Sequence, residues 1–495
     1  MGTANSIHEI KILIQSYHPL ITIEESDEER VVDVCRSVSI QLKMPLFEWS
    51  IATGLRRYPD TNALYQSQDP LKMLDHLQTL TVNGIFILKD FSRQFEDAAV
   101  LRKMREACLR FSKTRATIIL TSPRIEIPSE LKAHAVPYRL NSPSEKELAE
   151  VVASVIQSLK KSHGIKITAE KEDAVSLVRQ LQGLSSNQVR QAVAHAVLSR
   201  GELSRETIAE IAKEKVRLIS EGGLLEYFPP LDNRSELGGF EKLKAWLDRA
   251  KTGFSDQARE LNLAPPKGIL LVGVPGSGKS LAAKSIARRW NLPLLKLEMG
   301  RLYDKYIGES EKNFRRSTEM AEAMAPIVLW FDEIEKALQT GDGSQDGGLG
   351  TRILGQFLTW LQEKKANVFV VATANDLSKL PPELMRKGRF DEIFFVDLPN
   401  PSEREVIFQI HLKLRNQDSS HFDLKILSEA AEGFTGAEIE QAVISSLYRM
   451  LHDKLKLTTD LIVDEIRSTV PLSKSQSEKI DELRRYADGR FVSVS

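Results

Sequence analysis

PPKGILLVGVPGSGKS, at residues 265–280, is the most informative part of this 495-residue chain. Its first half is an apolar run without polar alternation, which is typical of a parallel strand buried on both faces. Its second half matches G-x-x-x-x-G-K-[ST] and opens a segment with helical spacing. Glycines let the backbone curl until successive N–H groups face one anion, and the following helix N-terminus adds partial positive charge. The stretch predicts a strand, a phosphate-binding loop and a helix.

This loop supplies the predicted contacts to a nucleotide. Lys279 is placed to reach the β- and γ-phosphates, and the Ser280 hydroxyl is placed to bind Mg²⁺. An ordinary strand–turn–helix is the alternative interpretation. The predicted contact residues are Gly273, Val274, Pro275, Gly276, Ser277, Gly278, Lys279, Ser280 and Leu281.

A second buried run, IVLWFD, leads into two adjacent carboxylates, Asp332 and Glu333. Open α/β sheets bind ligands at the carboxyl ends of their strands, so we expect these groups beside the phosphate loop. Asp332 can then hold the Mg²⁺ shell, and Glu333 can polarise an attacking water. A solvated acidic strand end is the alternative.

Three further polar residues lie downstream. Asn375 ends the strand VFVVATAN, where a neutral amide can help to hold the water; a turn-forming asparagine is the alternative. Arg386 and Arg389 lie in LMRKGRFDE, and a planar guanidinium suits a γ-phosphate. An arginine supplied by another subunit raises turnover in some NTPases by roughly 10³–10⁵. Ordinary surface arginines are the alternative for both positions.

Strands and helices alternate along the C-terminal half. Strands are predicted at 266–273, 292–297, 326–331, 367–373 and 393–398, and helices at 280–290, 310–325 and 351–364. This alternation predicts an α/β fold with a parallel sheet covered on both faces. Helical spacing continues from Pro399 to about residue 455, and we expect further helix in the tail to residue 495. The Gly-, Asp- and Ser-rich stretch 341–350 is a predicted loop.

The N-terminal half repeats this order in five matches, each weak alone. KMPLFEWS at 43–50 resembles NLPLLKLE at 291–298, and NGIFILKDF at 83–91 lies where APIVLWFDE lies. The other three matches begin at Ala116, Ile127 and Gly183. Strands are predicted here at 19–24, 44–49, 84–89 and 116–121.

The repeat lacks the residues of a phosphate site. After LITIEE stands Ser26-Asp27-Glu28-Glu29-Arg30, which has no glycine to curl, no lysine, and acidic groups that repel phosphate. Lys89-Asp90-Phe91 replaces the Asp-Glu pair. We therefore expect this half to bind no nucleotide.

The ordered motifs of residues 235–455 resemble the AAA+ ATPases, in their AAA subfamily. SELGG at 235–239 is similar to the segment whose backbone, near Gly238, lines the adenine. LPPELMRKGRFDEIFFVDLPNPSERE resembles the second region of homology, in which Arg386 matches the principal arginine finger and Arg389 the second. GFTGAEIEQAV resembles the helical lid, with Gly436 and Ala437 where other branches carry a sensor arginine.

The resemblance implies Mg²⁺-dependent ATP hydrolysis by a homo-oligomeric ring, expected to be a hexamer, that remodels or threads a protein partner. LYDKYIGESEKNFRR resembles the pore loop, in which Tyr306 and Ile307 would grip a translocating chain. The alternative is that Tyr306 packs on the neighbouring domain.

Four domains are expected, with residues 219–236 as a linker between the halves. They are a degenerate AAA+-like α/β domain at 1–142, its helical lid at 143–220, an AAA+ ATPase α/β domain at 221–398, and a helical lid with C-terminal tail at 399–495.

Composition limits the rival functions. Lys+Arg and Asp+Glu both total 68, which gives no overall attraction to nucleic acid, so a nucleic-acid remodeller is the less favoured alternative. No apolar run approaches the ~18 residues of a membrane span. A nucleotide-gated switch or scaffold with slow turnover stays open. The whole chain further resembles AAA-domain reading-frame proteins of cyanobacteria and algal chloroplasts, which implies a cyanobacterial cytoplasm or a plastid stroma.

Overall fold

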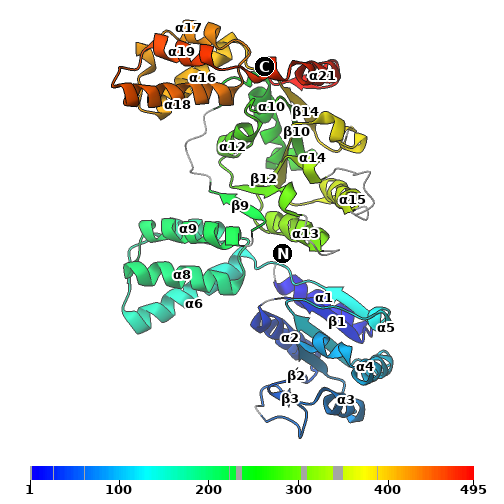
Figure 1. The fold of residues 1–495 in the computed structure, drawn as a ribbon. Coiled ribbons are helices and arrows are strands. Elements are labelled where there is room, and N and C mark those ends of the chain that lie inside the picture. The colour runs from blue at the N-terminus through cyan, green and yellow to red at the C-terminus, as the bar shows by residue number, and fades with distance from the viewer. Residues whose placement is uncertain are drawn as a thin grey trace. The chain divides into compact units, whose positions relative to one another are not determined.

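The computed structural model describes residues 3–495 except 26, 61, 222, 230–236, 303–308, 338–348 and 387. The chain divides into two compact units, Met1–Ile211 and Ala212–Ser495, which we call unit 1 and unit 2 and describe separately (Figure 1). No helix in the described part of the chain is long and apolar enough to cross a membrane.

Unit 2 is built on a sheet in the order β15-β14-β10-β13-β12-β11-β9. The parallel strands are β10 (Gly268–Gly273), β11 (Leu294–Glu298), β12 (Ile327–Asp332), β13 (Val368–Ala374) and β14 (Glu392–Val396). All residues of β10 and β13 are buried, which explains their unbroken apolar sequence. The predicted α/β fold is confirmed.

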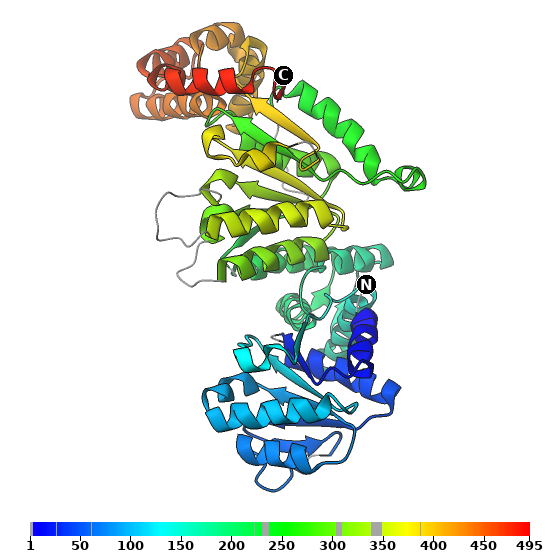
Figure 2. The same ribbon diagram turned by 90° about the vertical axis from the view of Figure 1, so that its right-hand side faces the viewer.

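Helices cover both faces of this sheet. They include α10 (Glu241–Lys251), α12 (Lys279–Trp290), α13 (Glu309–Ala323), α14 (Ile334–Ala337) and α15 (Leu349–Glu363). On one face Trp290 of α12 packs edge-on against Phe369 of β13, with ring centroids 4.5 Å apart. On the other, Phe357 of α15 packs against Phe331 of β12 at 5.0 Å. Figure 2 shows α13 and α15 side by side on that second face.

A helical lid follows β14. Its helices are α16 (Pro401–Leu414), α17 (Leu424–Ala430), α18 (Gly436–Asp453) and α19 (Thr459–Ser468). Asn400 and Thr435 begin α16 and α18 with capping boxes. The side chain of each accepts a hydrogen bond from the N3 backbone N–H, and its own backbone N–H donates to the side chain of the N3 glutamate. Buried Phe408, Leu427 and Ile462 belong to one apolar cluster that joins these helices.

The tail contains the further helix that was expected, together with one short strand. After α20 (Leu472–Ser475) and α21 (Ser477–Ala487), β15 (Val492–Ser493) adds to the sheet beside β14.

Residues 219–236 were expected to be a linker, but β9 (Leu225–Phe228) within them pairs antiparallel with β11. Gly-Gly and Pro-Pro dominate that segment and conceal the alternation of buried Leu225 and Tyr227 with exposed Glu226.

Unit 1 repeats the arrangement, with sheet order β3-β2-β4-β5-β1-β6. Its strands are β1 (Leu20–Glu24), β2 (Leu46–Ser50), β3 (Gly54–Arg57), β4 (Ile85–Lys89), β5 (Thr117–Ser122) and β6 (Ala135–Tyr138). The run β2-β4-β5-β1-β6 matches β11-β12-β13-β10-β14 of unit 2, strand for strand, and each sheet ends with an antiparallel strand beside β2 or β11. The preceding AAA+-like module predicted from the repeat is confirmed, although β3 and β6 were not expected.

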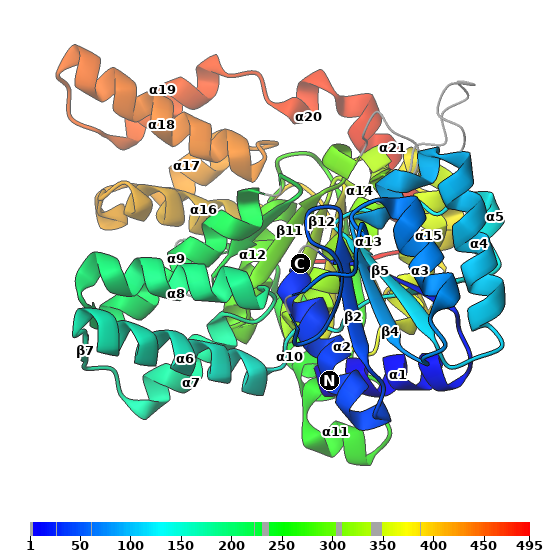
Figure 3. The same cartoon turned by 90° about the horizontal axis from the view of Figure 1, so that it is seen from below.

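Helices cover both faces of this sheet too, as the view from below shows (Figure 3). Buried residues of α1 (Thr3–Gln15) and α2 (Glu28–Leu42) pack on one face, and those of α3 (Pro70–Thr79) and α4 (Ala98–Phe111) pack on the other. A helical part follows, with α6 (Glu145–His163), α7 (Lys171–Gln180), α8 (Ser186–Arg200) and the short strands β7 (Lys166–Ile167) and β8 (Glu202–Leu203). Helix α9 (Arg205–Glu221) begins in unit 1 and ends in unit 2.

Candidate active site

The loop between β10 and α12 curls as its glycines require. Gly276 and Gly278 have φ values of 76° and 99°, in the region that L side chains rarely adopt. At Gly273 a Cβ would lie 2.0 Å from the Val396 carbonyl oxygen, so the close contact between the loop and β14 excludes a side chain there. The glycine spacing thus follows from backbone geometry, which lets the loop curl into a concave surface.

Lys279 is folded into this loop. Its Nζ donates to the carbonyl oxygens of Gly273 and Val274, at 2.9 and 2.8 Å. Burial lowers the pKa of Lys279 to about 8, although nearby carboxylates, including Asp332, oppose the shift. Beside it the Ser277 hydroxyl is buried with no hydrogen-bond partner among the described residues. A buried ammonium and an unpaired buried hydroxyl are groups that an anion would satisfy.

The two carboxylates at the end of β12 point in different directions. Asp332 accepts a hydrogen bond from the Thr373 hydroxyl at 2.8 Å and pairs with Lys296 of β11 at 3.1 Å. Glu333 has a φ of 51° and accepts a hydrogen bond from the Asn375 amide at 3.4 Å. The left-handed backbone at Glu333 therefore separates the two side chains, which are adjacent in sequence.

Sequence reasoning missed Glu335, a third carboxylate close to these groups. It is buried, and one of its oxygens accepts the Asn375 backbone N–H at 3.0 Å. The other oxygen has no hydrogen-bond partner among the described residues, and burial raises the pKa of this group. The acidic spacing D-E-x-E after a buried strand was the available signal.

The loop and the carboxylates open onto a cavity of about 640 Å³, the nucleotide-sized cavity. Predicted residues that line it are Gly238, Pro275, Gly276, Ser277, Gly278, Lys279, Ser280, Leu281, Asp332, Glu333 and Asn375. Gly273 and Val274 lie at the start of the same loop and touch Lys279 through their carbonyl oxygens.

The lid supplies the opposite wall, much of which sequence reasoning missed. Ile407, Ile410, His411 and Leu414 of α16 line the cavity, as does Glu440 of α18. Burial lowers the pKa of His411, while Glu440 at 3.6 Å has the opposite effect.

The start of α18 contacts the phosphate loop directly. The Ala437 N–H donates to the Gly276 carbonyl oxygen at 3.2 Å. Gly436 and Ala437 both line the cavity, so no arginine projects from this position.

The predicted arginines do not line the cavity. Arg386 is exposed, and Arg389 donates to the Leu358 carbonyl oxygen at 3.1 Å. Tyr306 and Ile307 lie outside the described residues.

Unit 1 has the same cross-strand pair as unit 2 with its charges exchanged. In unit 2, Lys296 lies opposite Trp330 in the sheet and pairs with Asp332, two residues further along β12. In unit 1, Glu48 lies opposite Ile87 and pairs at 3.1 Å with Lys89, two residues further along β4. A lysine therefore stands at the end of the unit 1 strand where unit 2 has its first carboxylate.

The N-terminal end of α2 in unit 1 already has hydrogen-bond and ion-pair partners within the chain. The Asp27 side chain accepts the Arg30 N–H at 3.3 Å and caps the helix, and Glu28 pairs with Lys89 at 2.7 Å. Carboxylates of the chain itself thus occupy the end of the helix where an anion would otherwise bind.

Comparison with protein families agrees with this description. Residues 269–398 match the ATPase family associated with various cellular activities (AAA). Residues 6–140 match the N-terminal domain of SpoVK-like AAA ATPases, and residues 146–222 match the second domain of the same proteins.

Similar proteins extend along the whole chain. The AAA domain-containing protein ycf46 of Guillardia theta is 37% identical over 99% of this chain and 96% of its own length. The protein of the same name from Trieres chinensis is 35% identical over 98% and 97%. A proteasome-activating nucleotidase of Saccharolobus islandicus is 32% identical over 50% of this chain and 65% of its own length. The chain therefore belongs to the AAA ATPase family, in its SpoVK-like branch.

Proposed function

We propose that this protein is a Mg²⁺-dependent ATPase that converts ATP to ADP and phosphate at a single site in unit 2. The observation that carries the proposal is the cavity of about 640 Å³, onto which Lys279, Asp332, Glu333 and Asn375 all open. This volume falls within the roughly 300–1,000 Å³ of small-molecule sites.

The two ends of the cavity differ in chemistry, as the two ends of ATP do. At one end, loop N–H groups, the Lys279 ammonium and the Ser277 hydroxyl are suited to phosphate oxygens. At the other, Gly238, Ile407 and Ile410 form an apolar wall suited to an adenine ring. A bound phosphate would give Lys279 the counter-charge that it lacks among the carbonyl oxygens of its own loop.

The donor set also fits Mg²⁺, which prefers hard oxygen ligands and keeps several waters. Ser280 and Asp332 are the residues that would hold it. Magnesium would neutralise charge on the phosphates and orient the terminal one. Lys296 and Thr373 hold the two oxygens of Asp332 from either side, which fixes the direction of the carboxylate.

Glu333 would act as the general base towards the attacking water. The Asn375 amide donates to Glu333 here, and Lys336 pairs with its other oxygen. These contacts orient the Glu333 carboxylate, and the Asn375 amide can bind the same water. Glu335 fixes the position of Asn375, because its carboxylate accepts a hydrogen bond from the Asn375 backbone N–H.

We further propose that the chain assembles into a homo-oligomeric ring, a hexamer, and remodels a protein partner. The exposed position of Arg386, which does not line the cavity of its own chain, supports action on a neighbouring subunit. Arg389 would assist it, and Tyr306 with Ile307 would contact the partner. The similarity to a proteasome-activating nucleotidase and to a cell division cycle protein 48 homolog covers the half of the chain that carries this site.

In this proposal unit 1 binds no nucleotide and serves as a scaffold or docking surface. Residues 1–142 and 143–220 are its α/β domain and lid, and 221–398 and 399–495 are those of the ATPase module. The algal relatives support a plastid stroma or a cyanobacterial cytoplasm as the location.

Glu333→Gln and Lys279→Ala together test the site. Glu333→Gln should bind ATP with affinity close to wild type and lose at least about 100-fold in turnover, because an amide cannot accept the proton of the water. Lys279→Ala should lose ATP binding itself. Calorimetry and steady-state phosphate release measure the two effects. Near-normal turnover by Glu333→Gln would remove that residue from the mechanism.

A further inference from the structure

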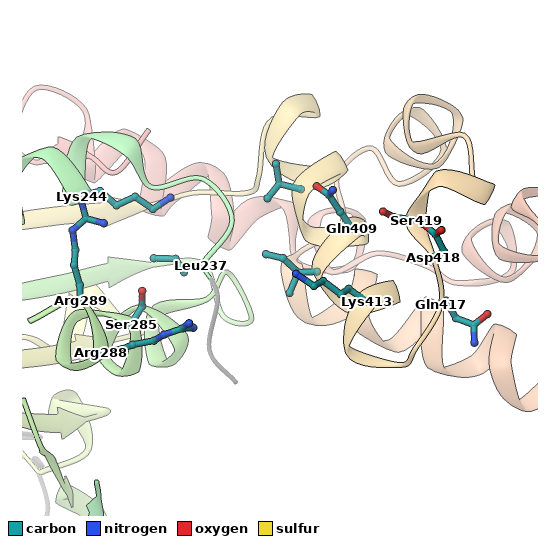
Figure 4. Close-up of a pocket in the computed structure, with 12 residues that line it drawn as sticks. Leu237, Lys244, Ser285, Arg288, Arg289, Gln409, Lys413, Gln417, Asp418 and Ser419 are labelled. Carbon is teal, nitrogen blue, oxygen red and sulfur yellow. The ribbon is translucent and has the colours of Figure 1, made fainter. Parts of the chain in front are cut away.

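Unit 2 has a second cavity, of about 700 Å³, between its α/β part and its lid (Figure 4). We call it the basic groove. It is lined by Leu237, Lys244, Ser285, Arg288, Arg289, Val406, Gln409, Ile410, Lys413, Gln417, Asp418 and Ser419. Its volume is close to that of the nucleotide-sized cavity, so it suits a small molecule.

The charge of the groove is strongly one-sided. Four of its five ionisable residues are basic, and the single acid, Asp418, already accepts the Ser420 N–H at 2.9 Å. Lys244 pairs with Glu241 and Arg289 with Asp248. The other two basic residues are Arg288 and Lys413. Neither pairs with a carboxylate within the described part of the chain.

These two side chains come from opposite walls. Arg288 belongs to α12 and Lys413 to α16, and Figure 4 shows both reaching into the space between the walls. Ser285 and Gln409 add neutral hydrogen-bonding groups from the same two helices. Cations from two walls with uncharged donors beside them form a site for a compact anion of more than one charge.

The groove adjoins the nucleotide-sized cavity at its apolar end, because Leu237 and Ile410 line both. Helix α12 carries Lys279 and Ser280 at its first turn and Arg288 two turns later. An anion held between α12 and α16 would therefore fix the lid against the helix that begins at the phosphate loop.

From these observations we infer that the basic groove is a second anion site, which takes a small, multiply charged phosphate compound and slows the release of nucleotide by holding the lid in place. The anion site itself does not depend on the proposed ATPase, whereas its effect on nucleotide release rests on that function.

Binding is tested in the full-length Lys279→Ala chain, so that the phosphate loop does not contribute, with inorganic pyrophosphate as the probe. Calorimetry should show submillimolar binding that weakens at least tenfold when Arg288→Gln and Lys413→Gln are added. The matched control adds Arg249→Gln and Lys425→Gln, which remove the same two charges from exposed sites on α10 and α17. It should bind within twofold of its parent. No binding by the parent, or equal affinities in groove and control variants, would overturn the site.

Coupling is tested by the dissociation rate of a fluorescent ADP chased with excess ADP, because simple competition for the phosphate loop does not change that rate. Pyrophosphate should slow dissociation at least threefold in the wild-type chain and in Arg249→Gln/Lys425→Gln, but not in Arg288→Gln/Lys413→Gln. An unchanged rate in the wild type would overturn the coupling and leave the ATPase proposal untouched. Thermal unfolding of each variant confirms that it folds.

Discussion

At the scale of single residues, Lys296 is an unexpected partner of Asp332 in the proposed catalytic centre. Its ammonium lies 3.1 Å from Asp332 and 4.7 Å from the centroid of the Trp330 ring. The pair is only partly exposed, so water screens it weakly. A cation this close to a metal-binding carboxylate opposes the approach of a second cation.

Lys296→Met should therefore raise the affinity of the ADP complex for Mg²⁺, by roughly three- to tenfold, which is about 1 kcal/mol. Calorimetric titration of Mg²⁺ into the ADP-saturated protein measures this. Lys284→Met is the matched control, because Lys284 lies 4.7 Å from the ring centroid of Phe228 and does not line the cavity. Weaker Mg²⁺ binding in Lys296→Met would mean that Lys296 assists the metal site.

The residues that sequence predicted for the cavity belong to short, contiguous motifs. Lys279, Ser280, Asp332 and Glu333 follow buried strands, so chain order alone places them at one sheet edge. His411 and Glu440 lie on lid helices, and their position depends on the packing of the lid, which no local pattern records. Lys296 was missed because a lysine in a strand normally indicates exposure.

At the scale of elements, the exchanged charges show what unit 1 has kept. The ends of β2 and β4 still carry a buried ion pair, and α2 still begins beside it. Two features differ from unit 2: the sign of the charge at the end of each of these strands, and the loop that precedes α2. Unit 1 therefore shares the strand order of unit 2, and we propose that it lacks the anion site.

The expected consequence is one nucleotide for each chain. The Mg²⁺-dependent binding of ATP should saturate at a single molecule in the wild type and fall to none in Lys279→Ala. The reason is that Asp27 caps α2, Glu28 pairs with Lys89 and Glu25 pairs with Arg30, so the start of α2 offers a phosphate no unpaired cation among the described residues. Residual binding in Lys279→Ala that disappears with EDTA would contradict this.

The hydrophobic periodicity of the sequence predicted the long helices and strands but not the short strands. The main strands of both units and the main helices of the α/β part of unit 2 match their predicted positions within a few residues. The strands β3, β6, β9 and β15 were missed, because two to four residues are too few to show alternation. All four lie at a sheet edge, where pairing with a distant strand defines them rather than their own sequence.

At the scale of the whole molecule, Arg386 connects the single chain to the proposed ring. Arg386→Ala should bind ATP normally and lose turnover, because its charge is needed only at the neighbouring site. Mixed with inactive Lys279→Ala protein, it should regain part of its activity, since some interfaces then join an intact cavity to an intact arginine. Phosphate release from the mixture measures this. Subunit-exchanging mixtures that stay inactive would contradict action between subunits.

The two sheets also end differently on the side of β6 and β14. In unit 2, β15 pairs with the outer side of β14, whereas β6 is the outermost strand on the corresponding side of the unit 1 sheet among the described residues. Exposed strand edges recruit strands from other molecules and so promote aggregation. Pro137 lies within β6 and has no N–H to donate, so it interrupts any ladder that a foreign strand could form there. An edge that no further strand covers among the described residues can therefore persist at β6 without promoting polymerisation, which is a requirement of the proposed assembly from several copies of the chain.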